Sequence, residues 1–203
     1  LTRLRSRPRS AWIQSASYSA RIDGIRLREG RLTFQFVNNT PAPVTVPLAP
    51  LGLAIESLQQ NGKTPSWGTT ASGNVVIVAP PGTSTVTGNW SLPGRKIVSL
   101  VDFDLSLAPA VQTSLVLDLP SGYRLSSSEG QISREIATLL PAVPEGHRRV
   151  RLDLGRRTHC QLVVDQAPTA APASPTRLLL RQSSSCEISI SGARIVTELV
   201  FER

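Results

Sequence analysis

The sequence predicts an all-β protein: an antiparallel β-sandwich of immunoglobulin-like or jelly-roll-like type, followed by a smaller β region. Two observations carry this prediction. Apolar residues alternate with polar ones along most of the chain, which is the period of a strand that buries one face. Turn-forming pairs such as Asp23-Gly24, Asn61-Gly62 and Pro81-Gly82 separate the alternating runs, as they do in sandwiches and barrels. We expect at most one short helix.

The predicted sandwich covers residues 12–120 and follows a basic linker at residues 1–11. Because successive side chains of a strand point to opposite faces, each alternating run is expected to bury one face. Pro81-Gly82 fits the centre of a type II turn, where proline fixes φ and glycine takes a positive φ. The apolar residues that mark the strands are Tyr18, Ala20 and Ile22; Leu32, Phe34 and Phe36; Val44, Val46 and Leu48; Val75 and Ile77; Val86 and Leu92 near Trp90; Phe103, Leu105 and Leu107; Leu115, Leu117 and Leu119.

The second β region is predicted at residues 121–203. Helical spacing of apolar residues predicts a short helix at residues 131–140. Two further strands are expected to form a hairpin around a loop at residues 155–158. They are marked by Val150, Leu152 and Leu154, and by Cys160, Leu162 and Val164. An exposed loop rich in alanine and proline at residues 165–176 precedes the last strands.

The two ends of the chain suggest that it belongs to a longer protein. The last residues echo the pattern that begins at Ser17, which predicts the opening hairpin of another β unit, with chance as the alternative. The sequence contains no methionine, even at position 1, so we expect it either to begin inside a longer protein or to have been trimmed. No run approaches the 18–20 apolar residues of a membrane-spanning helix.

The formal net charge of +8 requires that a nucleic-acid partner be considered. Only two of the 22 basic residues are lysines, Lys63 and Lys96. Phosphate surfaces use lysine as readily as arginine. The bias therefore indicates the coding preference of a GC-rich genome, with a functional anion surface as the alternative, and we do not expect nucleic acid to be the partner.

A basic cluster nevertheless stands out near the predicted hairpin. It consists of Arg148, Arg149, Arg151, Arg156 and Arg157. Such a patch could bind an acidic polysaccharide, a lipopolysaccharide phosphate or nucleic acid. No aromatic residue lies among these arginines, so the stacking platform of a single-strand binder is missing. The alternative is an ordinary arginine-rich surface.

The sequence predicts no catalytic residue, no metal site and no cofactor. Its two histidines, His147 and His159, lie outside any nucleophile or metal motif. Asp102 and Asp104 share one strand face and could bind calcium or act in acid–base chemistry, but we expect them to form a solvated polar face instead. We therefore expect a protein that is not an enzyme.

The two cysteines, Cys160 and Cys186, flank the loop at residues 165–176. In an oxidising compartment a disulfide between them would close this loop and stabilise the fold by roughly 2–4 kcal/mol. The alternative is two buried free thiols.

Trp67 lies in a turn-rich stretch. An exposed tryptophan in such a loop could stack on a sugar ring, which is one use of loop tryptophans in carbohydrate-binding modules. The alternative is a tryptophan folded over the edge of the sandwich.

Several short strand and turn segments in the first half of the chain resemble those of a known group of proteins. They are Tyr18-Ser-Ala-Arg-Ile, Phe34-Gln-Phe-Val, Val46-Pro-Leu, Leu53-Ala-Ile-Glu-Ser-Leu, Val75-Val-Ile-Val-Ala-Pro-Pro-Gly, Trp90-Ser-Leu-Pro and Leu115-Val-Leu-Asp-Leu-Pro. In these patterns, residues 18–120 resemble β-sandwich regions of very large exported cell-envelope proteins of planctomycete-type bacteria. The resemblance implies a tandem sandwich without an assigned activity, located in the periplasm or at the cell surface.

These observations together predict a non-catalytic structural or adhesion-type module of a larger exported protein. Its partners would be other β domains of the same protein, or a glycan. The first alternative is a carbohydrate-binding module that uses Trp67. The second is an anion-binding domain that uses the arginines of residues 148–157.

Overall fold

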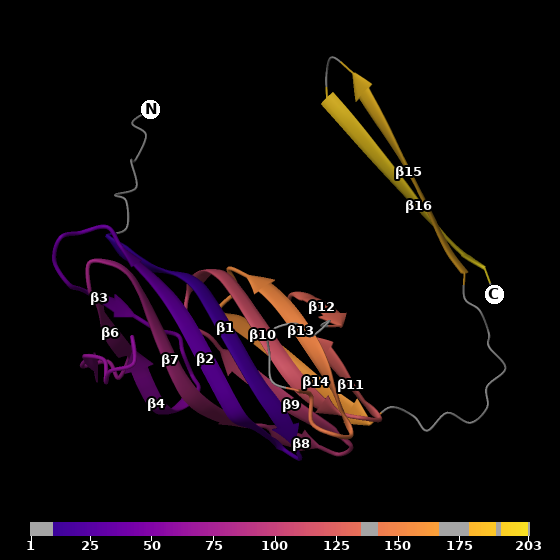
Figure 1. The fold of residues 1–203 in the computed structure, drawn as a ribbon. Coiled ribbons are helices and arrows are strands. Elements are labelled where there is room, and N and C mark those ends of the chain that lie inside the picture. Colours follow the sequence, from indigo (N-terminus) through magenta and orange to yellow (C-terminus); the bar gives the residue numbers. More distant parts are fainter. Residues whose placement is uncertain (1–9, 135–141, 167–178, 190–191, 203) are drawn as a thin grey trace. The chain divides into compact units, whose positions relative to one another are not determined.

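The computed structural model describes residues 10–134, 142–166, 179–189 and 192–202. The chain divides into two units, Leu1–Ala167 and Pro168–Arg203. The described residues form strands and no helices, so the all-β prediction is confirmed (Figure 1). The part of the chain that the structure describes contains no helix long and apolar enough to cross a membrane.

The first unit is built on a seven-stranded sheet with the order β12-β13-β10-β1-β2-β7-β4. Its strands are β1 (Ala11–Asp23), β2 (Arg26–Asn38), β4 (Ala54–Gln60), β7 (Gly82–Pro93), β10 (Ala110–Pro120), β12 (Gln131–Arg134) and β13 (His147–Gly155). All neighbours are antiparallel except β1 and β10, which pair in parallel. The sheet centre therefore joins two segments that lie about a hundred residues apart in sequence.

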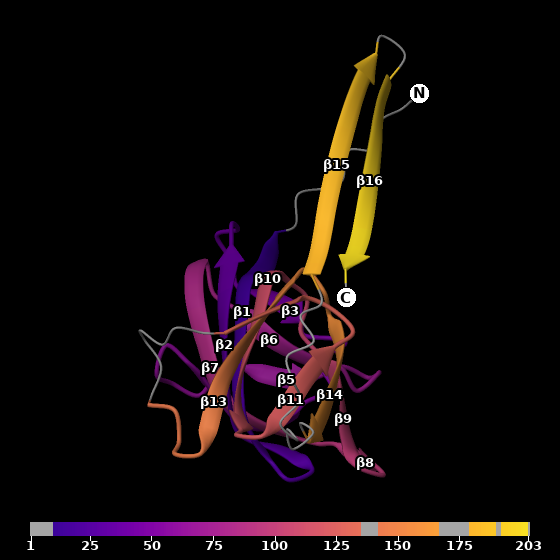
Figure 2. The ribbon, with the colours of Figure 1, turned by 90° about the vertical axis from the view of Figure 1, so that its right-hand side faces the viewer.

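Two smaller antiparallel sheets complete the first unit. The four-stranded sheet has the order β11-β14-β9-β8, from β11 (Tyr123–Ser127), β14 (His159–Gln166), β9 (Leu100–Ser106) and β8 (Arg95–Ile97). The three-stranded sheet has the order β3-β6-β5, from β3 (Val44–Pro47), β6 (Val75–Ala79) and β5 (Trp67–Thr69). Figure 2 shows both on the same side of the seven-stranded sheet. The buried faces of all three sheets form one hydrophobic cluster.

Three aromatic side chains meet in this core. Tyr18, Phe34 and Trp90 are almost completely buried. The Tyr18 ring meets the rings of Phe34 and Trp90 edge-on, with centroids 5.7 and 6.3 Å apart, a favoured aromatic geometry. Their polar atoms are satisfied inside the core. The Ala108 N–H donates to Tyr18 Oη at 3.0 Å, and Trp90 Nε1 donates to the Arg31 carbonyl at 2.9 Å.

Two local predictions were wrong. Residues 131–134 form strand β12 rather than the start of a helix, because they pair with the edge of β13; residues 135–140 lie outside the described residues. β13 and β14 are joined by the predicted turn but do not form a hairpin. β13 pairs with β10 and β12, and β14 with β9 and β11, so the turn connects two different sheets.

The end of the first unit does not coincide with the boundary proposed at residue 120. β11–β14 all belong to the sheets of the first unit. The described residues of the second unit form an antiparallel pair, β15 (Leu179–Ser189) with β16 (Gly192–Glu202), in which Ser189 pairs with Gly192.

Candidate ligand-binding site

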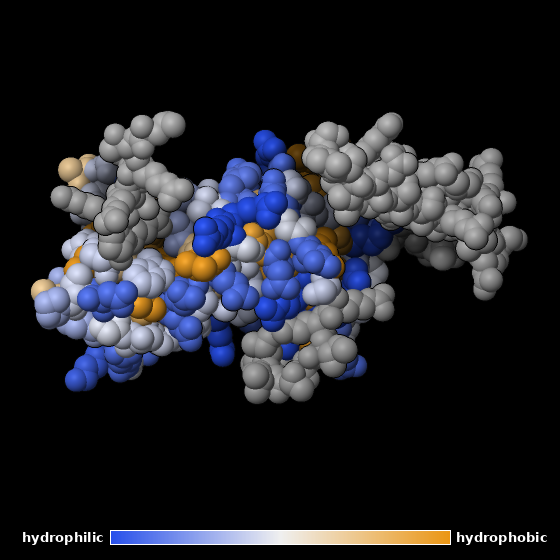
Figure 3. Space-filling view, turned by 90° about the horizontal axis from the view of Figure 1, so that it is seen from above, coloured by the Kyte–Doolittle hydropathy of each residue, from blue (hydrophilic) through white to orange (hydrophobic). Residues whose placement is uncertain are grey.

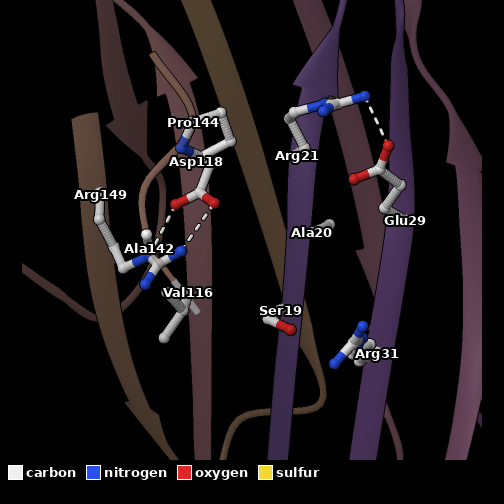
Figure 4. Close-up of a pocket in the computed structure, with 10 residues that line it drawn as sticks. All are labelled: Ser19, Ala20, Arg21, Glu29, Arg31, Val116, Asp118, Ala142, Pro144 and Arg149. Carbon is white, nitrogen blue, oxygen red and sulfur yellow. Dashed lines mark hydrogen bonds and ion pairs between the residues drawn. The ribbon is translucent and has the colours of Figure 1, made fainter. Parts of the chain in front are cut away.

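A hollow of about 200 Å³ lies on the outer face of the seven-stranded sheet (Figure 4). We call it the outer-sheet hollow. Strand alternation builds it: residues of β1, β2, β10 and β13 that point away from the core line it, together with the core residue Ala20 and the segment before β13. The lining residues are Ser19, Ala20, Arg21, Glu29, Arg31, Val116, Asp118, Ala142, Pro144 and Arg149.

A β-bulge shapes one side of the hollow. The register shifts between Ser19 and Arg21 on β1, and between Leu27 and Gly30 on β2. Glu29 at this bulge has a φ of 52°, which is uncommon for a residue with a side chain. Bulges redirect side chains. Here the result is that Glu29 Oε1 lies 2.6 Å from Arg21 Nη2.

The backbone beside the bulge is held from the core side. A Cβ at Gly30 would overlap the Trp90 carbonyl oxygen and indole ring, so only glycine permits this close approach. The same indole donates a hydrogen bond to the carbonyl of Arg31. Arg31 therefore extends from a strand whose position is fixed by the largest buried side chain of the protein.

The three arginines that line the hollow differ in whether a carboxylate pairs with them. Arg149 forms two bonds with Asp118, Nε–Oδ1 at 2.7 Å and Nη2–Oδ2 at 2.8 Å, and both side chains are largely buried. Arg21 is paired with Glu29. In the described part of the chain, by contrast, the Arg31 guanidinium has no carboxylate partner. Figure 4 shows Arg31 on β2 at the rim, near Ser19 of β1.

The two aspartates singled out from the sequence line a second hollow, of about 410 Å³. Asp102 is buried and accepts hydrogen bonds from Arg95 and Gln161, each at 3.0 Å. Asp104 is exposed, and its Oδ1 lies 2.7 Å from His159 Nε2. The contact between His159 and Asp104 was not predicted, because their proximity depends on the pairing of β14 with β9. No three His, Cys, Asp or Glu side chains of the described residues are placed to hold a metal ion.

The five arginines of the predicted anion patch do not form one surface. Arg148 donates to the Tyr123 carbonyl at 2.9 Å, and Arg149 is buried with Asp118. Arg151 pairs with Asp153 at 3.0 Å, and Arg157 pairs with Glu129. Arg156 lines a third hollow with Trp12, Ile13 and Val111. Asp118 on β10 and Glu129 in the loop after β11 thus neutralise Arg149 and Arg157, and both contacts depend on strand pairing that the sequence pattern does not show.

Exposed apolar side chains are scattered over the first unit. Trp67 is 52% exposed on β5, an edge strand of the three-stranded sheet. The view in Figure 3 shows hydrophilic residues over most of the described surface and hydrophobic ones in small separate patches. Single exposed apolar residues are normal and identify no site by themselves.

Cys160 lies in the core of the first unit, and no disulfide joins it to another described side chain. Its Sγ lies 3.1 Å from Ser127 Oγ, and burial raises the pKa of the thiol. Cys186 lies on β15, whose side chains are outside the described set. The disulfide between the two cysteines therefore stays a prediction.

Comparison with known proteins identifies solved structures with a similar fold. No family model and no curated protein sequence matches the chain. Among solved structures, an M1 zinc metallopeptidase from Deinococcus radiodurans matches with a TM-score of 0.50 and 14% identity, covering 94% of this chain and 47% of that one. Aminopeptidase A from Legionella pneumophila matches with a TM-score of 0.51 and 12% identity, covering 97% of this chain and 24% of that one. The chain spans about half the length of the first of these proteins and a quarter of the second.

These similarities overturn two expectations. The sequence predicts a non-catalytic structural or adhesion-type module, with glycan or anion binding as alternatives, and a protein that is not an enzyme; the solved structures reported above, which share the fold, are peptidases. These predictions failed for a physical reason. Alternation of apolar and polar residues shows which face of a strand is buried, but the same β fold can occur in proteins with different chemistry. At 12–14% identity the similarity concerns the fold, and this chain has a β fold found in the Deinococcus M1 zinc metallopeptidase and in the Legionella aminopeptidase A.

Proposed function

We propose that the chain is the β domain of a peptidase related to the M1 zinc metallopeptidases, and that it helps that peptidase to bind peptides. The observation that supports this is the match of 94–97% of the chain to part of such enzymes. One structure of the Deinococcus enzyme is bound to a Tyr-Ser-Ala substrate, and the Legionella enzyme is in complex with aspartic acid. Peptide and amino-acid ligands are therefore the class to test.

Zinc itself does not fit the described residues. Catalytic zinc needs three protein ligands, for which histidine and carboxylate are typical. The nearest candidates are His159 and Asp104, with Asp102 beside them, but the Asp102 oxygens already accept hydrogen bonds from Arg95 and Gln161. The whole sequence also contains no His-Glu-x-x-His. We therefore derive no hydrolytic step from these residues.

The outer-sheet hollow offers what peptide binding requires. Arg31 and Ser19 supply polar groups at its rim, and Val116, Ala142 and Pro144 supply small apolar surface. Binding sites commonly combine apolar walls with a few placed polar groups. The size of the hollow matches a single residue of a ligand rather than a long peptide.

The test is a peptidase assay of the natural full-length protein that contains this chain. Aminoacyl-coumarin substrates would be incubated with the protein as purified, after removal of metal by a chelator, and after zinc is restored. We expect release of the coumarin that is lost with the chelator and regained with zinc. Folded, zinc-loaded protein that cleaves none of a mixed set of aminoacyl substrates would refute the proposal.

A further inference from the structure

We propose that the outer-sheet hollow binds a single carboxylate through Arg31, and that its ligand is the C-terminal carboxylate of a short peptide. The carboxylate part stands on the geometry of the hollow alone. The identification of the carboxylate as that of a peptide rests on the proposed function.

The first argument is the balance of charge. Three arginines are among the described residues that line the hollow; Arg149 pairs with Asp118 and Arg21 with Glu29. Arg31 has no carboxylate partner among the described residues, and its guanidinium can offer a carboxylate two parallel hydrogen bonds. One bound carboxylate would balance the charge of Arg31.

The second argument is pre-organisation. Arg31 lies directly opposite Ser19 in the β1–β2 register, so a guanidinium and a hydroxyl meet at one rim. The backbone of Arg31 is fixed by the Trp90 hydrogen bond and by the close packing of Gly30 on the indole. A strand held in this way presents a charged side chain with less loss of conformational freedom on binding than a loop would.

The third argument concerns which anion fits. Arg31 can balance one negative charge, whereas Arg21 and Arg149 are already paired with Glu29 and Asp118, so a second negative charge on the ligand would lie next to carboxylates without a further cation among the described lining residues. A monoanionic carboxylate is therefore favoured over a phosphate dianion. The short apolar side chains of Val116, Ala142 and Pro144 leave room for a small side chain next to it.

The experiment uses the 203-residue chain and two ligands, N-acetyl-trialanine and its C-terminal amide. Binding would be followed by isothermal titration or by amide chemical shifts. We expect the free acid to bind at least tenfold more tightly than the amide, because only the acid can pair with Arg31. Arg31→Ala should weaken binding of the acid at least tenfold and leave binding of the amide unchanged. Inorganic phosphate at the same concentration should not displace the acid.

Arg28→Ala is the matched control. Arg28 lies on the same strand, is exposed and pairs with Asp23 outside the hollow, so its removal should change binding less than twofold. Circular dichroism would confirm that each variant folds, and Arg31→Gln replaces Arg31→Ala should the alanine variant fail. Equal binding of acid and amide, or unchanged binding by a folded Arg31 variant, would overturn the proposal. Because no hydrolysis is measured, loss of the peptidase hypothesis would leave this result intact.

Discussion

Tyr18 shows how much one polar atom can matter inside a β core. Its side chain is almost completely buried against Phe34 and Trp90, and its hydroxyl oxygen accepts the N–H of Ala108. Burial raises the pKa of the phenol far above its ordinary value of 10.0, because the charged phenolate would lose its hydration. Tyr18 therefore keeps its proton in the folded state at a pH where an unfolded chain has lost it.

This difference predicts the pH dependence of stability. Above pH 10 the unfolded state binds fewer protons than the folded state, so the free energy of unfolding falls as pH rises, by up to about 1.4 kcal/mol per pH unit. Tyr18→Phe should be about 1 kcal/mol less stable near neutral pH, since the Ala108 N–H loses its acceptor. Its stability should then fall less steeply above pH 10.

Urea unfolding at a series of pH values would measure both effects. Tyr123→Phe is the matched control, because Tyr123 is the other tyrosine and is more than a third exposed. Parallel stability curves for the wild type and Tyr18→Phe above pH 10 would contradict the argument.

At the scale of the element, the bulge in β2 depends on glycine. We expect Gly30→Ala to lower the free energy of unfolding by about 1–3 kcal/mol, because its methyl group would overlap Trp90 in a fully packed region. Gly68→Ala is the control: Gly68 lies in β5 with open space around its Cβ position, so this change should be neutral or slightly stabilising. Denaturant unfolding of both variants and of the wild type would measure these differences. If Gly30→Ala were as stable as the wild type, the bulge would have adapted to the side chain.

Strands could be predicted from the sequence where alternation was clear, but their partners could not. Tyr18, Phe103 and Leu152 each lie on a strand that was expected, and each buries the expected face. Alternation fixes the face of a residue and says nothing about which strand lies beside it. The predicted β13–β14 hairpin failed for this reason.

The same limit applies to the candidate site. Ser19 and Arg31 belong to neighbouring strands joined by the predicted Asp23-Gly24 turn, so their proximity could be predicted from the sequence. Asp118 and Arg149 join them only because β10 lies beside both β1 and β13. That strand order depends on how the complete sheet packs, and no local pattern encodes it.

At the scale of the whole molecule, the first unit carries the described core. All its buried apolar residues lie between Ile13 and Val164. We therefore predict that a chain ending at Ala167 folds with the same melting temperature as the 203-residue chain, within about 2 °C. A chain ending at Pro120 is the control and should not fold, because it lacks β13 and β14 with Leu152, Leu154 and Leu162.

Circular dichroism melting of the three chains tests this. A shorter chain ending at Ala167 that melts several degrees lower would show that the second unit contributes to the core of the first. A cooperative transition in the chain ending at Pro120 would show that β13 and β14 are dispensable.

The parallel pairing of β1 with β10 sets the timing of folding on the ribosome. β1 is made first, but its partner on that side follows about a hundred residues later. At synthesis rates of about 5–20 residues per second, one edge of the β1–β2 hairpin stays unpaired for about 5–20 s. An edge strand exposed for so long can pair with neighbouring chains. Production of this protein should therefore be sensitive to translation speed and to chaperones that cover nascent strands.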